Sequence, residues 1–210
     1  MEFVEGVTVS KWLKQRPRST RELLDVFLAA ARGLSSAHAA KLVHRDLKPD
    51  NMMIGLDGRT RVMDFGLARA AQAPAPEVLP EERHRSGVDS RIDARLTRDG
   101  ALLGTPAYMA PEQWRGDDVD ERTDQFAFCV SLWEALYGQR PFVGKTLHGL
   151  MLAITRGAIT PPPREGRRVP QWLRRALERG LSLAPDQRFP TMDALLAELE
   201  RGQKRQRRGV

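Results

Sequence analysis

Three short motifs in a fixed order constrain the fold of this 210-residue chain more than any other feature of its sequence. Segment 44–51 reads His-Arg-Asp-Leu-Lys-Pro-Asp-Asn, segment 64–66 reads Asp-Phe-Gly, and segment 110–112 reads Ala-Pro-Glu. Between the first two motifs lie two short apolar segments separated by Asp57-Gly58, which is typical of a β-hairpin turn. A single triplet is common by chance, but three in this order, with a hairpin between the first two, are not. The motifs therefore need one common explanation.

Helical periodicity covers most of the remaining chain. Apolar residues recur at three- and four-residue steps within 20–40, and Ser19 with Glu22 predicts a capping box at the start of this helix. Similar patterns predict further helices over 123–137, 146–155, 171–179 and 191–201. Segment 71–99 is polar, contains three prolines and shows no periodicity, which predicts a long loop. We expect a mainly α fold with one small hairpin.

The first motif matches H-R-D-x-x-x-x-N, a catalytic-loop pattern of phosphoryl-transfer enzymes. Together the three motifs resemble the protein kinase family, and more closely its bacterial eukaryotic-like serine/threonine kinases, as far as about residue 201. The resemblance implies the mainly helical C-terminal lobe of a two-lobed α+β parent fold, with the hairpin at the active-site edge. The implied function is transfer of the ATP γ-phosphate to serine or threonine residues of proteins in signalling. ATP and Mg²⁺ would be the cofactors.

The resemblance also implies roles for the polar residues of the first two motifs. Asp46 would orient the substrate hydroxyl and accept its proton, and Lys48 would reach the transferring phosphate. Asn51, the third residue of the catalytic group, would hold Mg²⁺ together with Asp64, because this hard cation prefers oxygen ligands.

Two further implications concern specificity and control. Lys48, together with Gly-Thr-Pro at 104–106, looks like the serine/threonine branch of the family, in which Thr105 would hydrogen-bond near the catalytic residues. Arg45, beside the catalytic aspartate, implies activation by phosphorylation of the loop between the second and third motifs. Thr97 lies where bacterial relatives autophosphorylate. The alternative, that Thr97 is only an exposed loop threonine, stays open.

Other residues resemble structural positions of the family. Glu112 and Arg188 would form a buried ion pair joining the long loop to the last helices. Asp124 would anchor the catalytic loop from the helix behind it. His44 and Phe65 are interpreted as packing residues.

Segment 1–6 resembles the hinge of these kinases, in which backbone groups of Glu2 and Val4 would meet adenine and Met53 would form the floor below it. The sequence contains no G-x-G-x-x-G-x-V loop and no V-A-I-K lysine, so we expect the N-terminal lobe to be missing. Three interpretations compete: an enzyme whose gene start is placed too late, a catalytically silent module that binds substrates or regulators, and a non-functional remnant. For residues 1–210 alone we expect little or no phosphate transfer.

Charge and composition indicate which other partners and which location to expect. The last ten residues carry five basic residues and no acid, which leaves only +2 of the net charge of +7 for the rest of the chain. We expect this tail, 201–210, to be disordered and to favour anionic membrane surfaces weakly. Nucleic acid is not an expected partner, because no aromatic residues interleave the basic ones. The single Cys129 and the lack of an apolar run long enough to span a bilayer make a reducing cytoplasm the expected location. The resemblance implies that segment 7–200 is the C-terminal lobe of a protein kinase, with 71–99 as a long insertion in its activation loop. Membrane anchoring of the parent protein stays open.

Overall fold

The computed structural model describes residues 5–65, 105–163 and 168–208. In chain order its elements are β1 (Gly6–Thr8), α1 (Val9–Gln15), α2 (Thr20–Ala39), β2 (Met52–Gly55), β3 (Thr60–Val62), α4 (Pro111–Arg115), α5 (Glu121–Tyr137), α6 (Leu147–Thr155), α7 (Gln171–Gly180) and α8 (Met192–Arg208). Short 3₁₀ turns cover Pro49–Asn51, Thr105–Tyr108 and Pro185–Gln187. Helices dominate and a small sheet accompanies them, as the sequence predicts. The predicted loop 71–99 falls outside the described residues.

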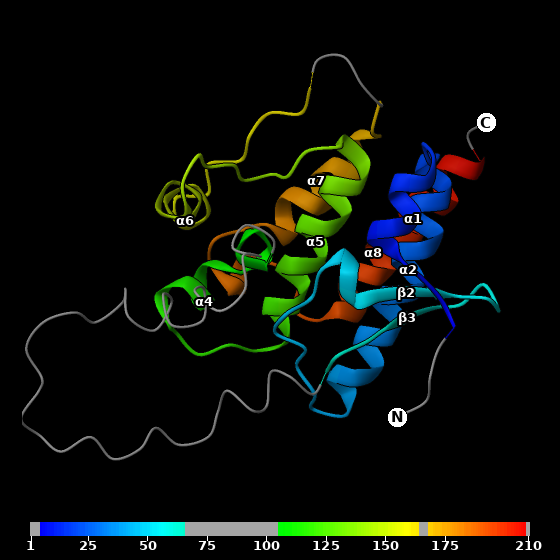
Figure 1. The fold of residues 1–210 in the computed structure, drawn as a ribbon, viewed down its shortest axis with the longest axis horizontal. Coiled ribbons are helices and arrows are strands. Elements are labelled where there is room, and N and C mark those ends of the chain that lie inside the picture. The colour runs from blue at the N-terminus through cyan, green and yellow to red at the C-terminus, as the bar shows by residue number, and fades with distance from the viewer. Residues whose placement is uncertain (1–4, 66–104, 164–167, 209–210) are drawn as a thin grey trace, which may run out of the picture.

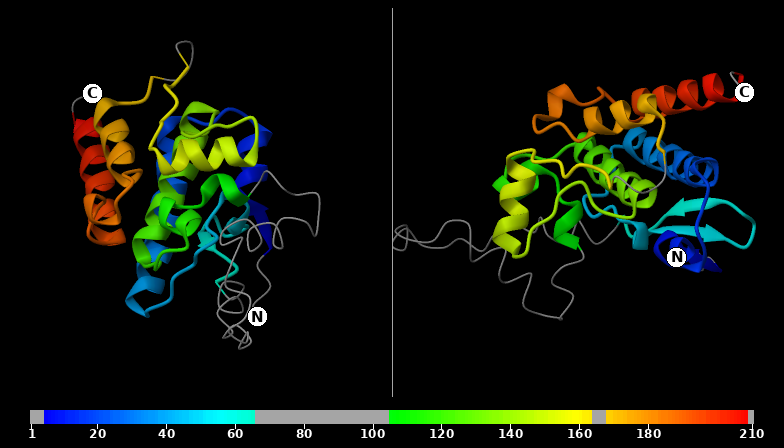
Figure 2. Two further views of the ribbon diagram at one scale, coloured as in Figure 1. Left: turned by 90° about the vertical axis from the view of Figure 1, so that its left-hand side faces the viewer. Right: turned by 90° about the horizontal axis from the view of Figure 1, so that it is seen from above.

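The helices and the sheet form three layers (Figure 2). Helices α7 and α8 lie side by side in one outer layer, α2 and α5 form the middle layer, and the sheet with α1 forms the third. The catalytic-loop segment leaves the end of α2 and leads directly into β2, so it lies where the middle layer meets the sheet (Figure 1).

Helix α2 begins with the capping box that its sequence predicts. The Ser19 hydroxyl accepts a hydrogen bond from the Glu22 N–H at 3.2 Å, and the Glu22 carboxylate accepts one from the Ser19 N–H at 2.8 Å. Phe27 and Leu34 on its apolar face are completely buried. These hydrogen bonds and this burial confirm the predicted helix. It could be predicted because both its start signal and its periodicity are local features of the chain.

Helix α5 is buried on nearly every side, as expected for the central helix of a helical lobe. Phe126, Phe128, Leu132 and Trp133 are all 0% exposed, although they point in different directions from the helix axis. Cys129 is equally buried, and burial raises the pKa of its thiol to about 12. Cys129 is therefore an inert core residue.

The sheet has three antiparallel strands in the order β1-β2-β3. The pairing of β2 with β3 confirms the predicted hairpin. Strand β1 was not predicted from the sequence. Its three residues carry no strand pattern of their own and form a strand only by pairing with β2. Gly6 lies opposite Gly55, and a Cβ on Gly6 would come within 2.2 Å of the Ile54 carbonyl oxygen. Gly6 belongs to this sheet, so the expected boundary between a hinge 1–6 and a domain 7–200 falls inside a strand.

The expectation of a disordered tail is wrong for residues 201–208, which continue helix α8. The basic residues Arg201, Lys204, Arg205 and Arg207 are exposed, whereas Gly202 is buried. Leu195, Leu199 and Gly202 lie on the buried face of this helix. The basic residues alone therefore gave the wrong prediction of disorder. None of the helices in the described ranges is both long and apolar enough to span a bilayer.

Gly202 provides a test of this docking. A Cβ at this position would lie 2.1 Å from a ring carbon of Trp172 in α7. For an undocked helix, Gly202→Ala should stabilise by about 1 kcal/mol through helix propensity. Here the overlap with Trp172 should outweigh that gain, because overpacking typically costs about 1–3 kcal/mol. We expect Gly202→Ala to have a lower free energy of unfolding in urea than the parent. Gln206→Ala, on the exposed face of the same helix, is the control and should stay within about 0.5 kcal/mol of the parent. An increase for Gly202→Ala would show that the tail is not docked.

Candidate active site

The loop between α2 and β2 gathers the polar residues of the first motif around one carboxylate, that of Asp46. Lys48 Nζ lies 3.0 Å from Asp46 Oδ2. The Asn51 side-chain amide donates hydrogen bonds to the Asp46 carbonyl oxygen at 2.8 Å and to Asp46 Oδ2 at 3.3 Å. Both contacts use the Asn51 nitrogen, so its amide oxygen is the atom that could face a cation. The Asp46 side chain is 36% exposed among the described residues, which leaves its carboxylate accessible to a substrate.

His44 ties the second motif to the first. Its Nδ1 accepts a hydrogen bond from the Asp46 N–H at 3.2 Å, so Nε2 carries the proton and donates to the Met63 carbonyl at 2.6 Å. The Phe65 ring packs edge-on against the imidazole, with 4.8 Å between ring centroids. Asp64 lies between these two anchored neighbours. The contacts of His44 are thus structural, and they hold Asp64 next to the catalytic loop.

Asn51 and Asp64 are the candidate ligands of a cation. The Met63 N–H donates to the Asn51 carbonyl at 2.9 Å and links the two segments. Asp64 is exposed and adopts a left-handed conformation with φ of 63°, which is costly for a residue other than glycine and typical of functional sites. Both side chains offer oxygen atoms, which suit Mg²⁺. No cluster of three or more His, Cys, Asp or Glu residues suited to a metal occurs in the described ranges.

Asp124, in the first turn of α5, holds the backbone of the catalytic loop. Its carboxylate is completely buried and accepts hydrogen bonds from the N–H groups of His44 and Arg45, both at 2.7 Å. His38 of α2 contacts the same carboxylate through Nε2 at 2.8 Å. The loop is therefore held by Asp124 of α5, and His38 of α2 contacts the carboxylate that holds it.

Glu112 and Arg188 form a buried, bidentate ion pair with distances of 2.8 and 2.7 Å. The Thr123 hydroxyl also donates to the Glu112 carboxylate, at 2.8 Å. The remaining donors of the guanidinium reach backbone carbonyls of Arg122, Ser182 and Leu183. Burial alone would raise the pKa of Glu112, but the hydrogen bonds and charge of Arg188 outweigh it, so the pKa lies below its ordinary value. This pair joins α4 to the segment that precedes α8.

Several predicted site residues are not brought into this group. Glu2, Val4 and Thr97 lie outside the described residues. The backbone of Thr105 begins a 3₁₀ turn. Met53 is half-buried in the middle strand of the sheet, and its contact with adenine stays a prediction.

Two residues with contacts to the site carry no sequence motif. His38 is a polar residue on the buried face of a predicted helix, and that position is the signal that it has a buried partner. Gln113 follows the third motif directly and donates to the Arg45 carbonyl at 2.8 Å. Nothing local in the sequence marks this contact, because the two residues are 68 positions apart.

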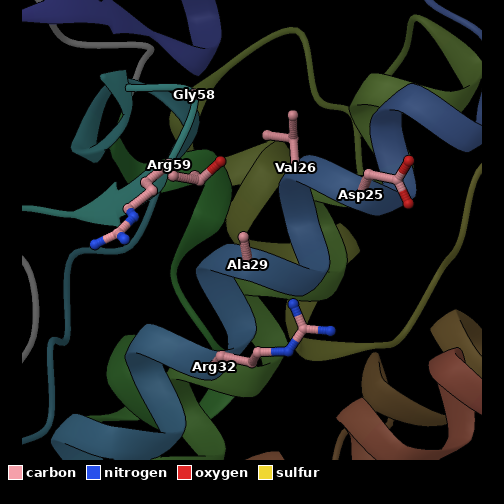
Figure 3. Close-up of a pocket in the computed structure, with 7 residues that line it drawn as sticks. Asp25, Val26, Ala29, Arg32, Gly58 and Arg59 are labelled. Carbon is pink, nitrogen blue, oxygen red and sulfur yellow. The ribbon is translucent and has the colours of Figure 1, made fainter. Parts of the chain in front are cut away.

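A groove of about 420 Å³ lies away from this site, between α2 and the turn that joins β2 to β3 (Figure 3). Val26 and Ala29 line it between the charged Asp25 and Arg32, with Arg59 on the hairpin side. The turn is at the opposite end of the hairpin from the catalytic loop, and no predicted site residue lines the groove.

Comparison with known proteins points to one family. A model of the protein kinase domain matches residues 1–198. The tyrosine-protein kinase MasK of Myxococcus xanthus is 33% identical over 95% of this chain and 30% of its own length. The serine/threonine-protein kinase PknB of Mycolicibacterium smegmatis is 31% identical over 96% of this chain and 29% of its own length. PknA of Corynebacterium glutamicum is 34% identical over 90% of this chain and 36% of its own length. The chain thus spans about a third of the length of these curated relatives.

Proposed function

The chain belongs to the protein kinase family, and on that premise we propose that it transfers the γ-phosphate of ATP to serine or threonine residues of protein substrates in signalling. One observation carries the proposal. The Asp46 carboxylate is partly exposed, with Lys48 at 3.0 Å and the Asn51 amide at 3.3 Å. Phosphoryl transfer mainly needs positioned oxygens and neutralised charge, and this group offers both.

The proposed mechanism assigns one task to each side chain. Asp46 accepts a hydrogen bond from the substrate hydroxyl and takes its proton as the oxygen attacks the γ-phosphorus of ATP. The bond between that phosphorus and the oxygen bridging it to the β-phosphate breaks, and ADP leaves with the bridging oxygen. Lys48 stays within reach of Asp46 and donates to an oxygen of the transferring phosphate. Asn51 and Asp64 would hold Mg²⁺ through their oxygen atoms. When bound, the cation supplies positive charge beside the phosphate oxygens.

Two features support serine or threonine as the acceptor rather than tyrosine. Lys48 follows Asp46 by two residues, and Gly-Thr-Pro occupies 104–106, as in the serine/threonine branch. PknB and PknA bear serine/threonine in their names, whereas MasK bears tyrosine.

The acceptor can be identified after labelling a protein substrate with γ-³²P-ATP and hydrolysing the product in acid. We expect phosphoserine and phosphothreonine, because Lys48 and Gly-Thr-Pro at 104–106 match the serine/threonine branch. Label found only in phosphotyrosine would refute the specificity and leave phosphate transfer itself intact.

A second candidate is a catalytically silent module that binds kinase substrates or regulators. It is favoured by the lack of a glycine-rich phosphate loop and of a V-A-I-K lysine in the 210 residues. Catalysis is favoured by the presence of Asp46, Lys48, Asn51 and Asp64 together. We propose that the described residues form the large lobe of a kinase and that the glycine-rich loop and lysine are contributed by a segment outside this sequence.

A further inference from the structure

Gln113 makes two contacts that face in opposite directions. It lies in the first turn of α4, where its Oε1 accepts a hydrogen bond from the Ala110 N–H at 2.9 Å. Its Nε2 donates to the Arg45 carbonyl at 2.8 Å. Only this orientation of the amide satisfies both partners, because one partner is a donor and the other an acceptor. The side chain therefore connects the third motif to the catalytic loop.

Arg45 needs such a connection because its backbone conformation is unfavourable. Its φ is 68°, in the left-handed region that residues with a Cβ rarely adopt. Asp124 binds its N–H at 2.7 Å and Gln113 binds its carbonyl at 2.8 Å. The residue is thus held from both sides, by α5 and by α4.

The Arg45 carbonyl belongs to the same planar peptide as the Asp46 N–H. That N–H donates to His44 Nδ1 at 3.2 Å. Fixing the carbonyl on one side and the N–H on the other sets the plane of this peptide, and with it the position of the Asp46 Cα from which the side chain leaves the backbone. Gln113 supplies the contact on the carbonyl side.

We propose that Gln113 is a positioning residue that orients Asp46 by holding the Arg45–Asp46 peptide. The inference rests on the proposed function as far as Asp46 is the catalytic base. It also predicts that an amide is needed at position 113. A carboxylate could still accept from Ala110 but could not donate to Arg45, and its oxygen would face the Arg45 carbonyl oxygen.

The alternative is a purely structural role, in which Gln113 only caps α4. Glu is as good as Gln, or better, at this third helical position, where its charge also suits the helix N-terminus. A pure cap therefore predicts that Gln113→Glu is harmless. The positioning role predicts that the same substitution makes the catalytic loop less rigid. The two roles therefore predict different effects of Gln113→Glu on the order of the loop.

Hydrogen exchange followed by mass spectrometry on the 210-residue chain distinguishes the two roles without any activity. In Gln113→Glu we expect the amides of Arg45 and Asp46 to exchange about tenfold faster, as for a partly buried acceptor that loses its donor. Exchange over 111–115 should be unchanged or slower. Gln113→Met, which removes both contacts without adding charge, should accelerate exchange in both segments and decides the matter if the Glu variant does not fold.

Gln139→Glu is the matched control, because the Gln139 amide also donates to a backbone carbonyl, that of Pro161, at 2.8 Å but on the exposed surface. It should leave exchange over 44–47 unchanged. Exchange over 44–47 that stays at the parental rate in both Gln113 variants would overturn the proposal.

The effect on catalysis is measured with the natural gene product, by which we mean this chain together with the proposed segment that carries the glycine-rich loop and lysine. Gln113→Glu should lower kcat about tenfold with no change in KM for ATP, because Gln113 acts through the peptide before Asp46. Gln139→Glu should leave both constants unchanged. Faster exchange with an unaltered kcat would also overturn the positioning role. If the parent itself shows no transfer, the proposed function fails, while the exchange experiment still decides whether Gln113 holds the loop.

Discussion

Replacing Asp46 by Asn should lower phosphate transfer by the natural gene product by about 10²- to 10⁴-fold, the usual contribution of a positioned general base. Asparagine has the same shape and can still accept a hydrogen bond from Lys48, but it cannot take a proton from the substrate. The fold should survive, because the loop is anchored through His44 and Arg45 to Asp124 rather than through the Asp46 side chain. Initial rates with a protein substrate give the comparison.

Asp50→Asn is the control for the loss of charge. Asp50 lies in the same loop and is exposed, so its substitution removes one negative charge without touching the group around Asp46. We expect it to retain most of the parental rate. An Asp46→Asn variant as fast as Asp50→Asn would show that Asp46 is not the base.

The largest effect on stability is expected at the buried ion pair. Glu112→Gln leaves the guanidinium of Arg188 in a fully buried site without its counter-charge, which should cost about 3–5 kcal/mol of the free energy of unfolding. The exposed pair Arg174–Glu178 has the same N–O distance of 2.7 Å. Glu178→Gln should cost less than about 1 kcal/mol, as for surface pairs in general. Urea unfolding at neutral pH measures both, and equal losses would contradict this account of the pair.

The same pair predicts a pH dependence. The pKa of Glu112 is lowered because the hydrogen bonds and charge of Arg188 outweigh the opposing effect of burial. The carboxylate therefore binds protons more weakly in the folded than in the unfolded chain. Its contribution to stability is complete above the ordinary value of 4.5 and is lost as the pH falls below it, through the lowered pKa. The difference in unfolding free energy between the parent and Glu112→Gln should shrink over that range.

Features encoded by neighbouring residues were predictable from the sequence. The capping box at Ser19, the periodicity of α2 and the turn after β2 all depend on residues within a few positions of one another. Strand β1 and the docked end of α8 were missed for the opposite reason. Three residues form β1 only because β2 is beside them. The end of α8 is docked by contacts distant in sequence, where Gly202 lies against Trp172 and the Gln203 amide donates to Asp25 of α2 at 2.9 Å.

The candidate site divides in the same way. Its motifs predict Asp46, Lys48, Asn51 and Asp64 as site residues, because phosphoryl transfer restricts both residue type and spacing. The supporting contacts of His38 and Gln113 span 86 and 68 residues, respectively. No local pattern carries such information, and only the folded arrangement of α2, α4 and α5 shows it.

The most direct test of the central claim is to incubate the natural gene product and a protein substrate with ATP labelled at either the γ- or the α-phosphate. The account predicts that label from the γ-position enters the protein, that chelation of Mg²⁺ prevents it, and that the α-label stays in the nucleotide. Label entering from the α-position, or no label from either position in the presence of Mg²⁺, would contradict the assignment of this chain to γ-phosphoryl transfer.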